Sequence, residues 1–151
     1  ASIDAGLGMV HQHFTLADNL SVLDNIILGT QPIWDFRIQH GEANDKILAL
    51  GLRFGLEVAP NARVSELSMG ERQRVEILKA LYRNAQILIL DEPTAVLTPQ
   101  ETETFFETLK KLVSGGLSLI FISHKMQEVL GDLTSFSNYG FQVYQKHTVL
   151  H

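Results

Sequence analysis

Two short apolar runs with a helix between them limit the fold of this chain more than any other feature. Residues 87–90 (ILIL) and 117–122 (LSLIFI) each have the length of one strand, and their apolar side chains fall on both faces. Residues 98–101 (TPQE) have the composition of a helix start, and residues 115–116 (GG) that of a helix end. A strand, a helix and a second buried strand form a βαβ unit of a parallel sheet. The sequence therefore predicts an α/β fold.

The other elements are predicted from capping signals and apolar spacing. Ser68 is expected to cap a helix over about 69–83, with Glu71 completing the capping box. Further predictions are a strand over 7–12, a short helix from Ser21 to near Gly29, and a helix from Glu42 to about Phe54. The buried stripes are expected to be Val75, Leu78 and Leu81 in one helix and Phe105, Leu109 and Leu112 in the next.

Composition excludes several classes of protein. A chain of 151 residues with 45% hydrophobic content suits one soluble domain. The net charge is −5 and no basic run exceeds Lys110-Lys111, so nucleic-acid binding is not expected. The absence of cysteine excludes disulfides and suits a cytoplasmic protein. No apolar run reaches the ~20 residues of a membrane span. The first residues carry no basic signal and no methionine, so we expect the chain to begin inside a longer one.

Polar residues follow each predicted strand at its carboxyl end, where ligands bind in open α/β sheets. Asp91 and Glu92 end one strand, His124 ends the next, and Gln12 ends the first. The acidic pair has two interpretations. It simply terminates a strand, or one carboxylate holds Mg²⁺ through water while the other deprotonates an attacking water, as in the Walker B arrangement. His124 alone is equally consistent with a hydrogen-bonded surface histidine.

The start of the helix over 69–83 also has two compatible interpretations. Ser68 caps the helix, and Gly70 in its first turn lets another surface approach the backbone N–H groups, which favour an anion such as phosphate. His11 and His13 have no third ligand at a sensible spacing, so a metal site there is not favoured. Trp34 is expected to be a packing residue.

Taken together, these stretches resemble the ATP-binding cassette (ABC) transporter ATPases. LSMGERQRVEILKALYRNAQILILDEPTAVLT is similar to their signature helix, Walker B strand and following loop. GMVHQHF resembles their Q-loop and ISHK their switch-histidine loop, so four motifs occur in the family's order. HQHFTLADNLSVLDNI, ERQRVEILKAL and DEPTAVLTPQE are most similar to ATPase subunits of bacterial importers for nucleosides and simple sugars. The resemblance covers about residues 5–130.

The resemblance implies ATP and Mg²⁺ as cofactors and assigns four roles in the chain's own site. Gln12 would sense the γ-phosphate and Mg²⁺ and couple to the membrane subunits. Asp91 would hold Mg²⁺ through water, Glu92 would be the general base, and His124 would contact the γ-phosphate and position the lytic water.

The resemblance also implies a site shared with a second cassette. ABC cassettes pair head to tail, so Ser68 and Gly70, with Glu71 beside them, would contact ATP held by the partner. Two positions depart from the family pattern in this signature: Met69 replaces a glycine, and Glu71 replaces a glutamine. Thr98 stands where the loop after Walker B commonly ends in aspartate, which puts the communication between the two sites in doubt.

The largest departure is the absence of a P-loop. No Gly-x-x-x-x-Gly-Lys-Ser/Thr occurs, and the aromatic residue that stacks on adenine is missing. The resemblance implies that the P-loop strand lies between the strands over 87–90 and 117–122 in a complete cassette, so a central strand is expected to be missing here. Either those two strands pair directly, or another segment fills the gap. The predicted domains are a partial ABC ATPase over 1–130 and a divergent tail over 131–151. Within the first, 13–66 is a helical subdomain and 67–130 belongs to the core.

These observations predict the distal part of the ATP-hydrolysing subunit of an importer for nucleosides or simple sugars. The expected partners are a second cassette and transmembrane permease subunits, at the cytoplasmic face of the inner membrane. Two alternatives remain. One is a soluble ABC ATPase without a transport role, and the other is a truncated module that binds its partners without turnover. This chain alone is expected to be inactive, because the P-loop is absent.

Overall fold

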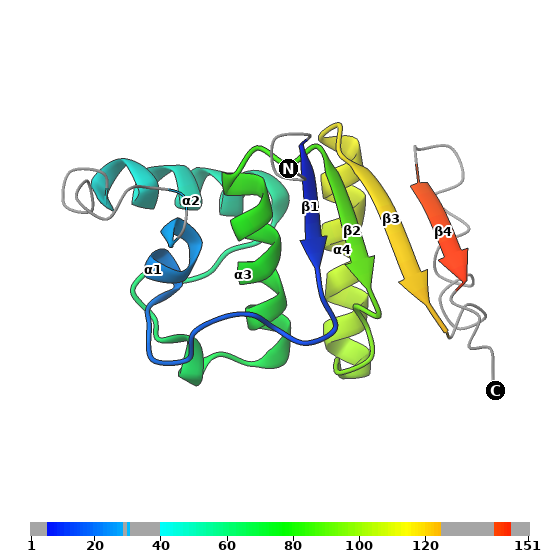
Figure 1. Ribbon diagram of the computed structural model, residues 1–151, viewed down its shortest axis with the longest axis horizontal. Helices are drawn as coiled ribbons and strands as arrows, with labels where there is room; N and C mark the ends of the chain where they lie inside the picture. Colours follow the sequence, from blue (N-terminus) through cyan, green and yellow to red (C-terminus); the bar gives the residue numbers. More distant parts are fainter. Residues whose placement is uncertain (1–5, 29, 31–39, 125–140, 146–151) are drawn as a thin grey trace.

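A four-stranded sheet with the order β1-β2-β3-β4 forms the centre of the protein, and all three of its strand pairs are parallel. The computed structural model describes residues 6–28, 30, 40–124 and 141–145. In Figure 1 the strands run side by side in one direction, α4 crosses behind β2, and α1 to α3 lie beyond β1. The sheet confirms the predicted α/β class.

The predicted βαβ unit is present. Strand β2 spans Ile87–Asp91, helix α4 spans Pro99–Ser114 and strand β3 spans Ser118–Ser123. Thr98 caps α4 with a complete capping box, and the helix ends at Gly115. Helix α4 packs on the face of the sheet where β2 and β3 bury their side chains, and the fully buried members of this core are Leu88, Leu90, Leu109, Leu112, Leu119 and Phe121.

Strands β2 and β3 pair directly, with Ile87 opposite Ser118 and Asp91 opposite Ile122. No strand stands between them in the described residues, because they hydrogen-bond to each other along their whole length. Of the two alternatives for this pair, direct pairing is the observed one.

Helix α3 links the sheet to the smaller helices. It spans Met69–Tyr82 and carries the capping box between Ser68 and Glu71 that the sequence predicts. The expected stripe of Val75, Leu78 and Leu81 is buried. Strand β1, Leu7–Val10, lies beside β2 and is two residues shorter than predicted. Gly8 allows β1 to lie close to α3, because a Cβ there would lie 2.8 Å from the Cβ of Ala80.

The helical part consists of α1 (Val22–Ile27), α2 (His40–Phe54) and a 3-10 turn at Val64–Glu66. Ser21 caps α1 by accepting a hydrogen bond from the Asp24 N–H, as predicted. Helix α2 begins two residues earlier than predicted, at His40 rather than Glu42. The same hydrophobic core runs through both the helices and the sheet. The boundary between a subdomain over 13–66 and the core over 67–130 therefore stays a prediction.

A fourth strand, β4, was not predicted. It spans Phe141–Gln145 within the tail and pairs in parallel with β3 on the side away from β2. The strand's position at the outer edge of the described sheet is visible in Figure 1. Trp34, the end of the predicted 1–130 domain and most of the tail lie outside the described residues.

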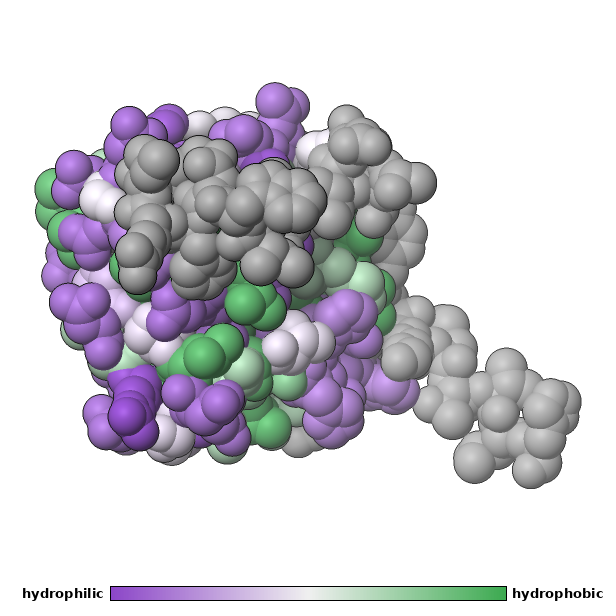
Figure 2. All heavy atoms as spheres, turned by 60° about the vertical axis from the view of Figure 1, so that its left-hand side comes forward, coloured by the Kyte–Doolittle hydropathy of each residue, from purple (hydrophilic) through white to green (hydrophobic). Residues whose placement is uncertain are grey.

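The face that carries the helices is mainly polar, with apolar patches between the polar groups (Figure 2). The exposed apolar side chains of α1 to α3 and their ends are Leu28, Leu48, Leu52 and Met69. Leu52 in α2 is 75% exposed. Among the described helices, none has the length and apolar character needed to cross a bilayer.

Candidate functional site

The carboxyl ends of β2 and β3 bring Asp91, Glu92 and His124 to one edge of the sheet. Because Asp91 pairs with Ile122, the next residues of the two strands lie side by side. The Glu92 N–H donates to the Ile122 carbonyl at 2.8 Å, which extends the ladder by one bond. Glu92 has a φ of 47°, a left-handed conformation that non-glycine residues adopt mainly where the surrounding structure imposes it. Such strain is concentrated at functional sites, and no residue pattern predicts it here.

Glu92 is held by three groups from the end of β3. Its Oε1 contacts His124 Nδ1 and accepts a hydrogen bond from the His124 N–H at 2.7 Å. Its Oε2 accepts a hydrogen bond from the Ser123 hydroxyl at 3.3 Å. The Glu92 side chain is 12% exposed and that of His124 is 44% exposed, so the pair reaches from the interior to the surface.

The same contacts set the charge of Glu92. Burial raises its pKa and is the largest single influence, but the hydrogen bonds and charge of His124 and the Ser123 hydroxyl act in the opposite direction. Together they lower the pKa of Glu92 below its ordinary value. Glu92 is therefore a carboxylate at neutral pH, the form that can accept a proton from water.

Asp91 has a free acceptor at the same edge. Its Oδ1 is buried and has no hydrogen-bond partner among the described residues. An orphaned carboxylate oxygen is unusual in a folded protein and indicates a group that binds there. Mg²⁺ fits, because it is held by one or two carboxylates while water and phosphate complete its shell. The described residues contain no group of three or more His, Asp or Glu side chains that could hold a metal ion by themselves, so Asp91 would hold the ion with few protein ligands.

Gln12 lies at the same edge but apart from the acidic pair. It follows β1, whose last residue, Val10, is paired with Leu90 one residue before Asp91. Its side chain is exposed in the loop between β1 and α1. The structure therefore places Gln12 two residues beyond the end of β1, at the same edge of the sheet as Asp91.

Ser68, Gly70 and Glu71 form a second group at the first turn of α3. Ser68 accepts from the Glu71 N–H at 3.2 Å, and Glu71 Oε2 accepts from the Ser68 N–H at 2.8 Å. None of these bonds reaches Glu92 or His124. That the two groups act in different ATP sites, one of them shared with a second cassette, stays a prediction.

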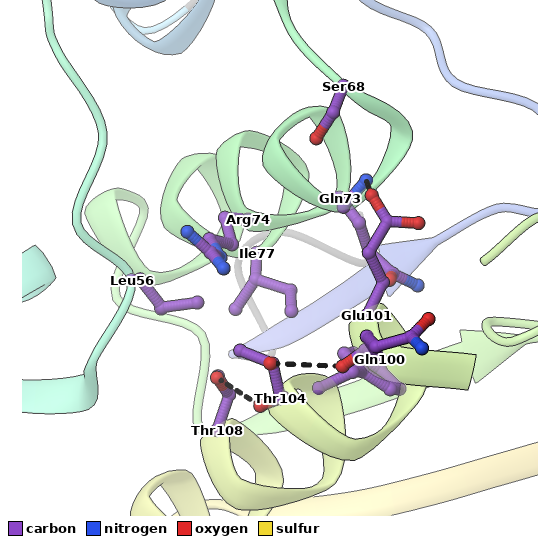
Figure 3. A pocket seen from close by; sticks show the side chains of 11 residues that line it. Leu56, Ser68, Gln73, Arg74, Ile77, Gln100, Glu101, Thr104 and Thr108 are labelled. Atoms are coloured by element: carbon purple, nitrogen blue, oxygen red, sulfur yellow. Dashed lines mark hydrogen bonds between the residues drawn. The ribbon is translucent and has the colours of Figure 1, made fainter. Parts of the chain in front are cut away.

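The Gly70 N–H is not free in this chain. Glu101, from the first turn of α4, accepts a hydrogen bond from it at 3.2 Å and reaches toward α3 across the hollow shown in Figure 3. A Cβ at position 70 would lie 3.0 Å from Glu101 Oε1, so the glycine makes room for this carboxylate. The Thr98 N–H is the largest cause that lowers the pKa of Glu101, and the Gly70 N–H adds to it. The surface that approaches Gly70 here is the chain's own α4.

Gln73 joins the two groups and was missed by the sequence reasoning. Its side chain is 3% exposed, and its Nε2 donates to the carbonyl of Pro93, the residue after Glu92, at 2.6 Å. Gln73 thereby fixes the strained turn at Glu92 to the signature helix. A polar residue among the buried, mainly apolar positions of α3 was the available signal, and Glu76 is a second one. Ser123 and Glu101 were read only as a strand end and a helix cap.

Comparison with known proteins identifies the family. The sequence model of the ABC transporter family matches residues 1–95. The chain belongs to the ABC transporter family. The family is one of ABC-type ATPases.

Similar ABC proteins are import ATPases. The nucleoside import ATP-binding protein NupA of Lactococcus lactis subsp. cremoris is 50% identical over 124 residues, which is 82% of this chain and 24% of NupA. The glucose import ATP-binding protein TsgD13 of Haloferax volcanii is 44% identical, covering 85% of this chain and 28% of that protein. The chain thus spans about a quarter of the length of these curated relatives.

Solved ABC cassettes share the fold. A nucleotide-free ATP-binding cassette of an ABC transporter matches with a TM-score of 0.69 at 21% identity, over 86% of this chain and 55% of that one. A dimeric bacterial ABC transporter cassette matches with a TM-score of 0.61 at 30% identity, over 80% of this chain and 53% of that one. The predicted fold class, a partial P-loop ATPase of the ABC type, is therefore confirmed.

Proposed function

We propose that this chain is the distal part of the ATP-hydrolysing subunit of an ABC importer for nucleosides or simple sugars. Family membership and the import names of NupA and TsgD13 support the proposal. The observation that carries it is the Glu92 carboxylate, held by His124 and Ser123 at the edge where Asp91 keeps a free oxygen.

Each residue at this edge has a role in ATP hydrolysis. Asp91 holds Mg²⁺, which when bound neutralises charge on the phosphates. Glu92 accepts a proton from the attacking water, and His124 fixes the direction of the Glu92 carboxylate and contacts the γ-phosphate. Gln12, at the same edge, reaches the γ-phosphate and the ion from the opposite side. Since phosphoryl transfer depends on positioning and charge stabilisation, the rigid hold on Glu92 is the main contribution of this edge.

Two partners complete the activity. A second cassette supplies ATP to Ser68 and Gly70, with Glu71 holding the helix start. For the Gly70 N–H to reach a phosphate, the Glu101 carboxylate has to leave it. Transmembrane permease subunits are the second partner, which places the protein at the cytoplasmic face of the inner membrane. A groove on α2 that is lined by Leu48, Leu52 and Val58 offers them an apolar surface. No role in nucleic-acid binding is proposed.

A second candidate is a module that binds cassettes or permease subunits without turnover. The absence of a P-loop motif from the sequence favours it for this chain alone. A soluble ABC ATPase without a transport role is disfavoured, because NupA and TsgD13 are import proteins.

The test uses a complete cassette that contains this segment, assembled with its permease subunits in vesicles. Glu92→Gln keeps the shape of the side chain and removes its basic oxygen. We expect ATP binding to be retained, and both hydrolysis and uptake of radiolabelled nucleoside or pentose to fall by at least about 100-fold. Glu103→Gln, on the exposed side of α4, is the matched control and leaves turnover unchanged. Near-normal kcat in Glu92→Gln would show that Glu92 is not the base.

A further inference from the structure

Helix α3 carries two buried polar side chains that hold the loops on either side of it. Gln73 and Glu76 are 3% and 7% exposed and stand almost one turn apart. Gln73 binds the carbonyl of Pro93, next to Glu92. Glu76 binds the loop that follows Gln12, 61 residues away in sequence. The helix thus connects two loops of the proposed site.

The contact of Glu76 is made by one oxygen. Its Oε1 accepts hydrogen bonds from the Thr15 N–H at 2.9 Å and from the Thr15 hydroxyl at 3.1 Å. Thr15 is the third residue after Gln12 and is itself exposed. Ala17, two residues after Thr15 in the same loop, is held by the side chain of Asn25. Asn25 Oδ1 accepts from the Ala17 N–H at 2.7 Å, and Asn25 Nδ2 donates to the Ala17 carbonyl at 3.0 Å. The loop of Gln12 is therefore fixed by buried polar groups of α3 and α1.

Packing alone does not explain a carboxylate at position 76. The neighbouring side chains Val75, Ile77 and Leu78 are fully buried, and an apolar residue at 76 would join them without losing hydration. A buried carboxylate is unfavourable unless hydrogen bonds satisfy it, and those that it makes fix one residue of one loop. The effect of the Glu76 carboxylate that an apolar residue could not replace is therefore to hold Thr15 in place.

We propose that Glu76 is a positioning residue that fixes the loop of Gln12 on helix α3. The inference rests on the proposed function. Helix α3 begins at Ser68 and Gly70, which face the partner's ATP, while Gln12 belongs to the chain's own site. Glu76 therefore keeps Gln12 in a set position relative to the helix start, so that both sites are aligned when the cassettes close.

The first experiment measures the loop itself in this chain. Hydrogen–deuterium exchange of the Thr15 amide is followed in the wild type, Glu76→Ala and Glu76→Gln. Alanine removes the acceptor, and we expect exchange to accelerate by about tenfold or more. Glutamine keeps an acceptor oxygen, so exchange stays within about twofold of the wild type. Glu103→Ala, exposed on α4, is the control. Unchanged exchange in Glu76→Ala would overturn the inference.

The second experiment measures turnover in the complete assembly. We expect Glu76→Ala to lower kcat by about tenfold while KM for ATP stays within about twofold, because binding remains and alignment is lost. Glu76→Gln restores most of kcat. Thr15→Val, which removes only the hydroxyl donor, gives a smaller loss and serves if Glu76→Ala does not fold.

Two results would overturn the inference in different ways. If Glu76→Ala kept full kcat although the Thr15 amide exchanged faster, Glu76 would hold the loop by hydrogen bonds without contributing to turnover. A wild-type assembly without ATPase activity would overturn the proposed function, and this inference with it. The exchange measurement keeps the two failures apart, because it requires no nucleotide.

Discussion

The buried hydrogen bond from Gln73 to the Pro93 carbonyl gives a sharp prediction about stability. Gln73→Leu keeps a side chain of similar size but has no donor, so the Pro93 oxygen loses its partner at this 3% exposed site. An unsatisfied buried acceptor costs about 1–3 kcal/mol, and the added apolar surface offsets only part of this. For a chain of this length, Tm falls by about 2–4 °C for each kcal/mol.

The assay is urea unfolding of the chain, followed by circular dichroism. Gln100→Leu is the matched control, because Gln100 is exposed in the first turn of α4. We expect this control to change the free energy of unfolding by less than about 0.5 kcal/mol. If Gln73→Leu also stayed within that range, the bond would not stabilise the turn at Glu92, and our account of that turn would be wrong.

A second substitution at position 73 tests the hydrogen-bond donor separately from the shape of the side chain, because glutamate has nearly the shape of glutamine. In Gln73→Glu, an ionised carboxylate faces the Pro93 carbonyl, whereas the protonated acid can donate as glutamine does. Its pKa should be raised in the folded state, so stability should be greatest at low pH and be lost as pH rises through that folded pKa. A variant whose stability lacked this pH dependence would contradict the proposed geometry.

Three further predictions concern nucleotide and charge. The chain alone should show no low-micromolar ATP affinity in calorimetry, because the sequence lacks a P-loop. The pKa of Glu101 is lowered, so its contribution to stability is present above its ordinary value of 4.5 and lost as pH falls through the folded value. Glu101→Gln should remove that part of the pH dependence of unfolding. In a complete pair, Ser68→Arg in one cassette should abolish nucleotide trapping in the partner's pocket, as photolabelling would detect. Loss confined to the mutated cassette's own pocket would refute the shared site.

Capping residues and apolar runs, which involve only residues near one another in the chain, were sufficient to predict most of the helices and strands. The capping residues Ser21, Ser68 and Thr98 each accept the expected backbone hydrogen bond, because a cap depends on atoms within four residues. The apolar runs formed parallel strands as predicted, but only one face is fully buried, and the side chains on the other face are half-buried or exposed. The edge that carries Asp91, Glu92 and His124 followed from strand direction alone. The roles of these residues stay predictions.

Two structural features were beyond local signals. Strand β4 is held by pairing with β3, and nothing in its own sequence specifies that neighbour. The sequence also left open whether β2 and β3 pair directly, because apolar runs do not encode which strand lies beside which. Pairing of distant segments is settled by the packing of the whole sheet.

The sequence by itself determined the family, the α/β class, the elements and the residues at the carboxyl edge of the sheet. The tertiary structure alone decided how those residues are held. It gave Glu92 its left-handed backbone and its contact with His124, placed Glu101 on the Gly70 N–H, and set Gln73 and Glu76 against loops far away in sequence. The reason is physical. Elements form through contacts within a few residues, whereas buried hydrogen bonds and strained turns exist only when distant segments exclude water from the same place.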